Sequence, residues 1–135
     1  MAKSFAPPTY SSVSPYIMAA DATRLIGFLK ETAGAELRRE PMRRDDGSIK
    51  HAELQLGDTV IMISDATAEY PAGKSMTYIY VKNVDAAHKT ALSLGAVEVM
   101  PPTDCDHGER MGGVTDHSGN QWWFGEPIQK TGKAK

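Results

Sequence analysis

The sequence has little of several features that mark large classes of protein. It contains a single cysteine, Cys105, which cannot form an internal disulfide and suits a reducing compartment. Its only basic run is the closing KTGKAK, and the formal net charge is −2, so no broad positive surface for nucleic acid is expected. No apolar run approaches the roughly 20 residues that span a bilayer. We therefore expect a cytoplasmic protein with neither nucleic-acid nor membrane partners.

What the sequence does contain is a repeat at an offset of about 61 residues. The segments SPYIMAADATRLIGFLKETAGAEL and MTYIYVKNVDAAHKTALSLGAVEV align, and Gly57 matches Gly119 in the turns that follow. Self-similarity at a fixed period indicates two copies of one supersecondary unit. In each copy the pattern predicts a strand, a helix and three strands.

Each predicted helix has its own start and stop signals. In the first copy Asp21 or Thr23 can cap the amino end and Gly34 supplies the left-handed stop; in the second, Asp85 and Gly95 have these roles. The apolar stripes predicted to pack into the core are Leu25, Ile26, Phe28 and Leu29 in the first helix, and Ala87, Ala91, Leu92 and Leu94 in the second.

Alternation along the predicted strands separates two faces. The first strand of each copy carries tyrosine on one face and aliphatic residues on the other: Ser14, Tyr16 and Met18 oppose Ile17 and Ala19, and Met76, Tyr78 and Tyr80 oppose Thr77, Ile79 and Val81. Tyrosine combines apolar area with a polar tip, which favours a binding surface, although the same residues could cover ordinary core edges. In the last strand, Trp122 is expected in the core and Trp123 on the tyrosine-bearing face.

The duplicated order of elements, together with the segments FLKETAGAEL, DGSIKHAELQLGDTVIMISD and GVTDHSGNQWWF, resembles the vicinal oxygen chelate superfamily. This superfamily includes glyoxalase I, bleomycin resistance proteins and extradiol dioxygenases, and the hairpin around HAELQLGD is most similar to its PhnB-like or glyoxalase-like branch. The resemblance covers roughly Ser12 to Pro127. It implies an α+β fold of two tandem βαβββ modules, a curved mixed sheet around a cavity, helices on the outer face, and a homodimer. We place the modules at 12–70 and 71–127, between an arm at 1–11 and a flexible basic tail at 128–135.

The resemblance also implies where a metal would be bound. The ligand positions of metal-dependent members fall on Ser14, Ile61 (or Met62 if the register slips by one), Met76 and Trp123. None of these side chains is a usual ligand of a hard or borderline divalent cation. We therefore expect no cofactor, and leave open a divalent metal at a displaced site.

Polar residues elsewhere supply the alternatives. His51, Glu53 and Gln55 share one strand face, and the opposite face carries Ala52, Leu54 and Leu56. His51 and Glu53 are therefore candidates for a displaced metal site or for acid/base catalysis. The alternative is that this polar face is exposed to solvent or forms a hydrogen-bonded lining with no chemical role. The loop DCDHGERMGG matches no standard zinc spacing, and Cys105 in it is either a bystander or a reactive thiol. Arg110 could hold an anionic group of a ligand or lie solvated at the surface.

The sequence thus favours a metal-free cavity that binds a small aromatic or apolar molecule. The residues expected to line it are Tyr16, Met18, His51, Glu53, Gln55, Met62, Tyr78, Tyr80, Arg110 and Trp123. One alternative is a lyase, isomerase or dioxygenase with a non-standard site around His51 and Glu53. Another is an interaction module with no ligand-sized cavity.

Overall fold

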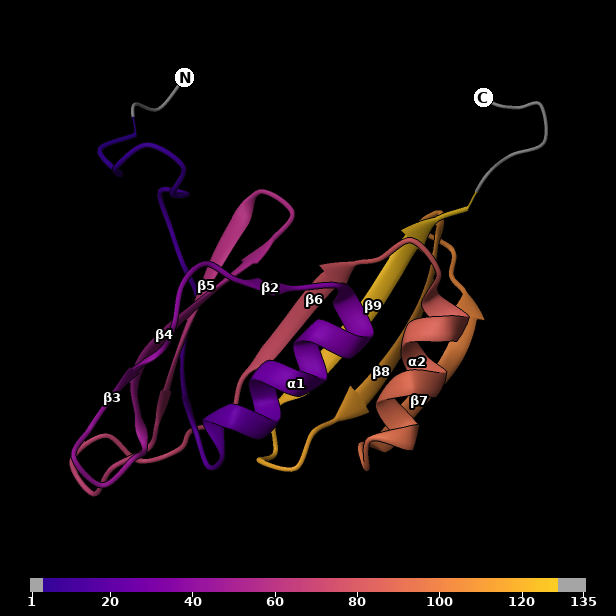
Figure 1. Ribbon diagram of the computed structural model, residues 1–135. Helices are drawn as coiled ribbons and strands as arrows, with labels where there is room; N and C mark the ends of the chain where they lie inside the picture. Colours follow the sequence, from indigo (N-terminus) through magenta and orange to yellow (C-terminus); the bar gives the residue numbers. More distant parts are fainter. Residues whose placement is uncertain (1–3, 129–135) are drawn as a thin grey trace. The chain divides into compact units, whose positions relative to one another are not determined.

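The computed structural model describes residues 4–128, so the first residues of the predicted arm and nearly all of the predicted basic tail lie outside it. The chain divides into two compact units, one holding the residues up to 30 and from 34 to 73, the other holding 31–33 and the residues from 74 on. Each unit has its own sheet (Figure 1). The elements of the first copy are β1 (Tyr16–Ala19), α1 (Ala22–Ala33), β2 (Glu36–Leu37), β3 (Met42–Arg43), β4 (Ile49–Leu56) and β5 (Thr59–Asp65). Those of the second are β6 (Met76–Tyr80), α2 (Val84–Ser93), β7 (Val97–Asp104), β8 (Glu109–Thr115) and β9 (Gln121–Pro127).

The two sheets repeat one topology. The strand order is β1-β5-β4-β2 in the first sheet and β6-β9-β8-β7 in the second. In each, the first strand pairs in parallel with the last, and the remaining pairs are antiparallel. This confirms the α+β fold of tandem modules. The first module differs in one respect: its edge is split into β2 and β3, which both pair with β4 and flank Pro41, a residue without a backbone N–H for the ladder.

Helix α1 begins and ends where the sequence indicates. The Asp21 side chain accepts a hydrogen bond from the backbone N–H of Arg24 at 3.1 Å. Gly34 follows the last turn with φ of 73°, a left-handed conformation that favours glycine. Leu25 and Leu29 are fully buried.

Helix α2 corrects two predictions. Asn83, not Asp85, caps it, accepting from the N–H of Ala86 at 3.0 Å. The predicted stripe was wrong at Leu92 and Leu94, which are exposed. The buried residues start at Val84 and follow the i, i+3, i+4, i+7 spacing of a helix face; they are Val84, Ala87, His88 and Ala91. The buried position of His88 was not predicted because its side chain is polar.

The closing turn and strand anchor the core of the second module. Trp122 is 0% exposed, and its indole N–H donates to Asp116 Oδ2 at 2.8 Å. The other oxygen of Asp116 accepts from the N–H groups of Ser118 and Asn120, which closes the turn. The placement of Trp122 in the core is therefore confirmed. Within the described residues, no helix is long and apolar enough to cross a membrane.

Candidate functional site

One face of the first sheet gathers the predicted polar residues. Tyr16 of β1 and Glu53 of β4 are both paired with Met62 of β5, and side chains directly opposite in a ladder share a face. Of the two residues that the sequence offered for the ligand position on this strand, Met62 is therefore the one on this face, whereas Ile61 is buried on the other face. The candidates brought together on this face are Tyr16, Met18, His51, Glu53, Gln55 and Met62.

At its centre is a hydrogen-bonded chain that runs from a buried carboxylate to an exposed phenol. Glu53 Oε2 lies 2.9 Å from His51 Nε2, and His51 Nδ1 lies 3.1 Å from the hydroxyl of Tyr16. The Tyr16 hydroxyl is also 2.8 Å from Ser64 Oγ, which donates to the carbonyl of Lys50 at 2.7 Å. We call Tyr16, His51 and Glu53 the relay.

The second oxygen of Glu53 is held by residues that precede β4. Tyr10 donates its hydroxyl hydrogen to Glu53 Oε1 at 2.6 Å, and the guanidinium groups of Arg38 and Arg39 lie 3.7 and 3.6 Å from the same atom. Burial by itself raises the pKa of Glu53, but the hydrogen bonds from Tyr10 and His51 and the charge of Arg39 outweigh it. The pKa of this carboxyl is therefore lowered, and Glu53 is ionised at neutral pH.

Arg38 links this carboxylate to the rest of the polar face. Its guanidinium lies 4.4 Å from the centre of the Tyr10 ring and donates to the side-chain oxygens of Gln55 and Thr9. Sequence reasoning missed Tyr10, Arg38 and Arg39, because nothing in their local pattern places them beside β4.

The corresponding face of the second sheet is aromatic. Tyr78 of β6 pairs with Trp123 of β9, and Trp123 pairs with Gly113 of β8. A Cβ at Gly113 would lie 2.7 Å from three atoms of the Trp123 ring, so the indole rests on the β8 backbone. A Cβ at Gly125 would likewise lie 2.1 Å from the Tyr78 hydroxyl. Glycine at these two positions lets the rings lie flat on the sheet, a requirement that alternation alone did not reveal.

Glu109 fixes the polar tips of this face. Its two carboxylate oxygens accept from the hydroxyls of Tyr78 and Tyr80, at 2.6 and 2.7 Å. These hydrogen bonds lower the pKa of Glu109. Burial and the bond to Glu109 raise the pKa of Tyr78, and the bond to Glu109 raises that of Tyr80, so both hydroxyls stay protonated. We call Met76, Tyr78, Tyr80 and Trp123 the aromatic face.

The two faces differ at one equivalent position. In the first sheet, Glu53 pairs with Met62, which pairs with Tyr16 of the first strand. In the second sheet, Gly113 pairs with Trp123, which pairs with Tyr78 of the first strand. Glu53 and Gly113 therefore occupy corresponding places. The second module therefore has an indole lying over a glycine where the first has a buried carboxylate. One module presents polar, charged groups and the other presents rings.

The donor groups present do not fit a divalent metal at the family's positions. Met62, Met76 and Trp123 offer no hard or nitrogen donor, and Ser14 offers a single neutral hydroxyl oxygen. The carboxylate of Glu53 and both ring nitrogens of His51 are hydrogen-bonded to one another and to Tyr10 and Tyr16. The two guanidinium groups beside Glu53 would also repel a metal cation. Among residues 4–128, no group of three or more His, Cys, Asp or Glu side chains could hold a metal ion.

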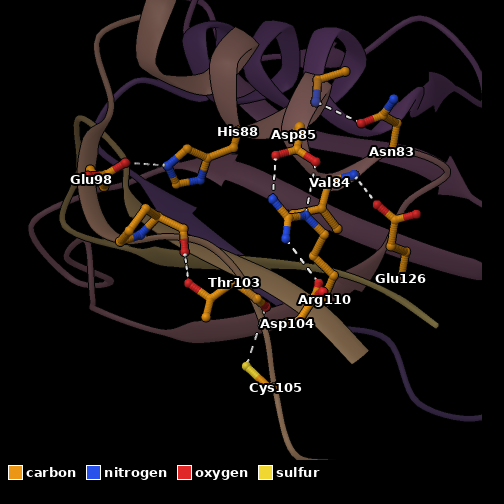
Figure 2. A network of polar contacts seen from close by, with 12 residues as sticks. Asn83, Val84, Asp85, His88, Glu98, Thr103, Asp104, Cys105, Arg110 and Glu126 are labelled. Carbon is orange, nitrogen blue, oxygen red and sulfur yellow. Dashed lines mark hydrogen bonds and ion pairs between the residues drawn. The ribbon is translucent and has the colours of Figure 1, made fainter. Parts of the chain in front are cut away.

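Arg110 lies on neither face. Arg110 lies between Glu109 and Met111 on β8, so strand alternation turns its side chain to the opposite side of the sheet, which packs against α2. Figure 2 shows its guanidinium between Asp85 and Asp104. The nitrogen–oxygen distances to these two carboxylates are 2.9 to 3.0 Å. These hydrogen bonds raise the pKa of Arg110 and lower that of Asp85. The open cleft of about 410 Å³ beside it is lined by these three paired charges together with Lys82, Asn83, Glu126, Pro127 and Ile128.

Comparisons with known proteins agree with this architecture. Residues 12–124 match the family model of the Glyoxalase/Bleomycin resistance protein/Dioxygenase superfamily. An uncharacterised protein of Mycobacterium bovis is 32% identical over 131 residues, which cover 88% of this chain and 85% of the relative.

Several solved structures share the fold at lower identity. TioX from Micromonospora sp. ML1 superposes with a TM-score of 0.69 at 22% identity, covering 86% of this chain and 98% of TioX. TnmS3, an antibiotic binding protein from Streptomyces sp. CB03234, gives a TM-score of 0.64 at 19% identity, covering 84% and 93%. The PhnB protein from Bacillus cereus also gives 0.64, at 16% identity, covering 84% and 98%. With the family model matched over nearly the whole described chain, this protein belongs to the Glyoxalase/Bleomycin resistance protein/Dioxygenase superfamily.

Proposed function

We propose that the protein binds a small aromatic or apolar molecule on the aromatic face, without a metal. The observation that carries this proposal is the exposure of large rings on a strand face. Tyr78 and Tyr80 are 39% and 62% exposed, beside the exposed Met76 and the half-buried Trp123. Exposed apolar groups gathered in one place mark a binding surface more often than scattered ones do.

The chemistry of the face suits a flat ligand. The ring of Trp123 is held on the β8 backbone, and Tyr78 and Tyr80 are oriented by Glu109, so little side-chain freedom is lost when a ligand stacks on them. Ring stacking contributes about 0.5 to 1.5 kcal/mol per pair beyond the burial of area. A few polar atoms among the rings would orient the ligand.

Two further observations support a binding role. The donor groups of the first face are engaged by one another, which disfavours the metal chemistry of other superfamily members. One protein of the same fold, TnmS3, is an antibiotic binding protein, which makes sequestration of a small molecule a reasonable function for this chain.

The test uses dansylamide, a small neutral aromatic probe whose emission rises in an apolar site. We expect saturable binding to the wild type and weakening of roughly 2- to 13-fold in Trp123→Ala, which is the stacking contribution expressed as a ratio of dissociation constants. The matched control is Tyr70→Ala, because Tyr70 is a similarly exposed ring outside the strands. Equal weakening in both variants, or no saturable binding, would contradict the proposal.

We also propose that the chain forms a homodimer, as the superfamily resemblance implies. Light scattering coupled to size exclusion measures the mass directly. A mass of about 29 kDa, twice that of one 14.7 kDa chain, is expected, and a mass that stays at the monomer value at every concentration would contradict it.

A further inference from the structure

The relay on the first sheet has a gradient of exposure that the binding proposal does not use. Glu53 is buried, the His51 side chain is 22% exposed, and Tyr16 is 52% exposed. In proteins, a buried carboxylate, an imidazole and an exposed hydroxyl in hydrogen-bonded order let the imidazole take the proton of the hydroxyl, while the carboxylate stabilises the imidazolium.

The hydrogens of these groups can be arranged in two patterns on the same heavy atoms, of which the second places a hydrogen in every contact. In the first, neutral His51 donates from Nε2 to the ionised Glu53, and its bare Nδ1 accepts the hydroxyl hydrogen of Tyr16. In the second, His51 carries a proton on both nitrogens and donates from Nδ1 to the Tyr16 oxygen. The Tyr16 hydrogen then points to Ser64 Oγ, and the Ser64 hydrogen points to the Lys50 carbonyl. Only hydrogens move between the two patterns.

From this we propose that Tyr16 is a catalytic acid/base residue in a reaction that deprotonates or protonates a small molecule. His51 accepts and returns the Tyr16 proton, and Glu53 stabilises the imidazolium. A proton leaving the substrate joins the Tyr16 oxygen as the phenol's own hydrogen moves to His51 Nδ1. The substrate is left as its conjugate base, and the imidazolium is paired with Glu53. The reverse step returns the proton, so no oxidant, reductant or co-reactant is needed.

The charges around the relay indicate the class of substrate. The titratable and charged groups facing His51 and Glu53 are Tyr10, Tyr16, Arg38 and Arg39. Of the two arginines, Arg38 has a side chain that is 19% exposed and donates to Gln55 and Thr9. Arg39, 3.6 Å from Glu53, has a side chain that is 55% exposed and can meet a ligand from solvent. Arg39 is thus placed to attract an anionic group, and the substrate is a small acid that also carries a negative charge.

The test needs no natural substrate, because a base-assisted phenol reacts faster with an aryl sulfonyl fluoride. The Tyr16 oxygen bonds to sulfur, fluoride leaves, and the phenol proton passes to His51. Tyr70 and Tyr80, 60% and 62% exposed, are internal controls of similar accessibility, and the carboxylate of Glu109 holds the proton on Tyr80. With benzenesulfonyl fluoride at pH 7, mass spectrometry of the wild type should show Tyr16 labelled about a hundredfold faster than Tyr70 or more, the low end of general-base assistance.

Variants separate the relay from simple exposure. In His51→Asn the Tyr16 rate should fall to that of Tyr70 at pH 7 and rise with pH in parallel with the Tyr70 rate. Replacing the probe by 4-(fluorosulfonyl)benzoate should increase the Tyr16 rate further, and in Arg39→Gln the ratio of the rates with the charged and the uncharged probe should fall to about one. Labelling of Tyr16 no faster than Tyr70 in the wild type would overturn the proposal without any variant having to fold. A rate insensitive to His51→Asn would overturn it equally.

Discussion

Substitution of Gly113 by alanine tests the packing on which the aromatic face depends. The new Cβ would lie 2.7 Å from Cδ2, Cε3 and Cζ3 of Trp123. Carbon atoms in contact sit about 3.5 to 4.0 Å apart, so the indole has to rise by about 1 Å. Overpacking of this kind costs about 1 to 3 kcal/mol, while alanine regains about 0.5 to 1 kcal/mol over glycine within a strand. We expect a net destabilisation of about 1 kcal/mol and a changed near-ultraviolet circular dichroism spectrum.

Urea unfolding of four proteins completes the test: the wild type, Gly113→Ala, Trp123→Val and the double variant. Without the indole the new methyl group meets no ring, so the alanine should become neutral or slightly stabilising, and the difference is the coupling energy between the two sites. Gly73→Ala is the control, because no heavy atom lies within 4 Å of a Cβ there. If Gly113→Ala were as stable as the wild type and left the spectrum unchanged, the stacking of Trp123 on β8 would be refuted.

Three further predictions concern the other contacts. Gly125→Ala should displace Tyr78 from Glu109, because its Cβ would lie 2.1 Å from the phenol oxygen; spectrophotometric titration should then show a tyrosine ionising at lower pH than in the wild type. The pKa of Glu53 in the folded protein lies below 4.5, so the stability that its charge contributes is present above pH 4.5 and is lost as the pH falls through the folded-state pKa. The free energy of unfolding of Glu53→Gln should therefore fall less steeply than that of the wild type in this acidic range. Denaturant unfolding at several pH values measures the difference. Trp122→Phe should cost about 1 to 3 kcal/mol in denaturant unfolding, because a buried carboxylate oxygen of Asp116 loses its donor, and a cost below 0.5 kcal/mol, the size of ordinary surface effects, would contradict that role.

Much of the fold could be predicted because it rests on local periodicity. The repeat specified two copies of one unit, and alternation with a period of two placed Trp122 in the core and Trp123 on the opposite face. The same rule put His51 and Glu53 side by side. The apolar stripe of α2 was partly wrong because a polar residue, His88, occupies a buried position that aliphatic pattern matching assigns to leucine.

The candidate site was less predictable, since its contacts join segments distant in sequence. Tyr10 lies 43 residues from Glu53, and no short-range pattern brings them together. The choice between Ile61 and Met62 required the pairing of β1 with β5, which a one-residue slip reverses. Arg110 was expected in the cavity lining, yet the phase of β8 turns it toward α2, where carboxylates from two other elements hold it.

Ligand contact with the aromatic face can be observed most directly through the methionines. Methyl groups labelled with ¹³C on Met76 and Met111 report on that face, and Met42, on β3 of the other sheet, is an exposed reference. During titration with dansylamide we expect saturable ring-current shifts at Met76 and Met111 and a constant signal at Met42, and in Trp123→Ala the shifts should reach half-saturation at a roughly 2- to 13-fold higher probe concentration. Shifts confined to other methionines, or none at saturating probe, would contradict the claim that this face binds aromatic molecules.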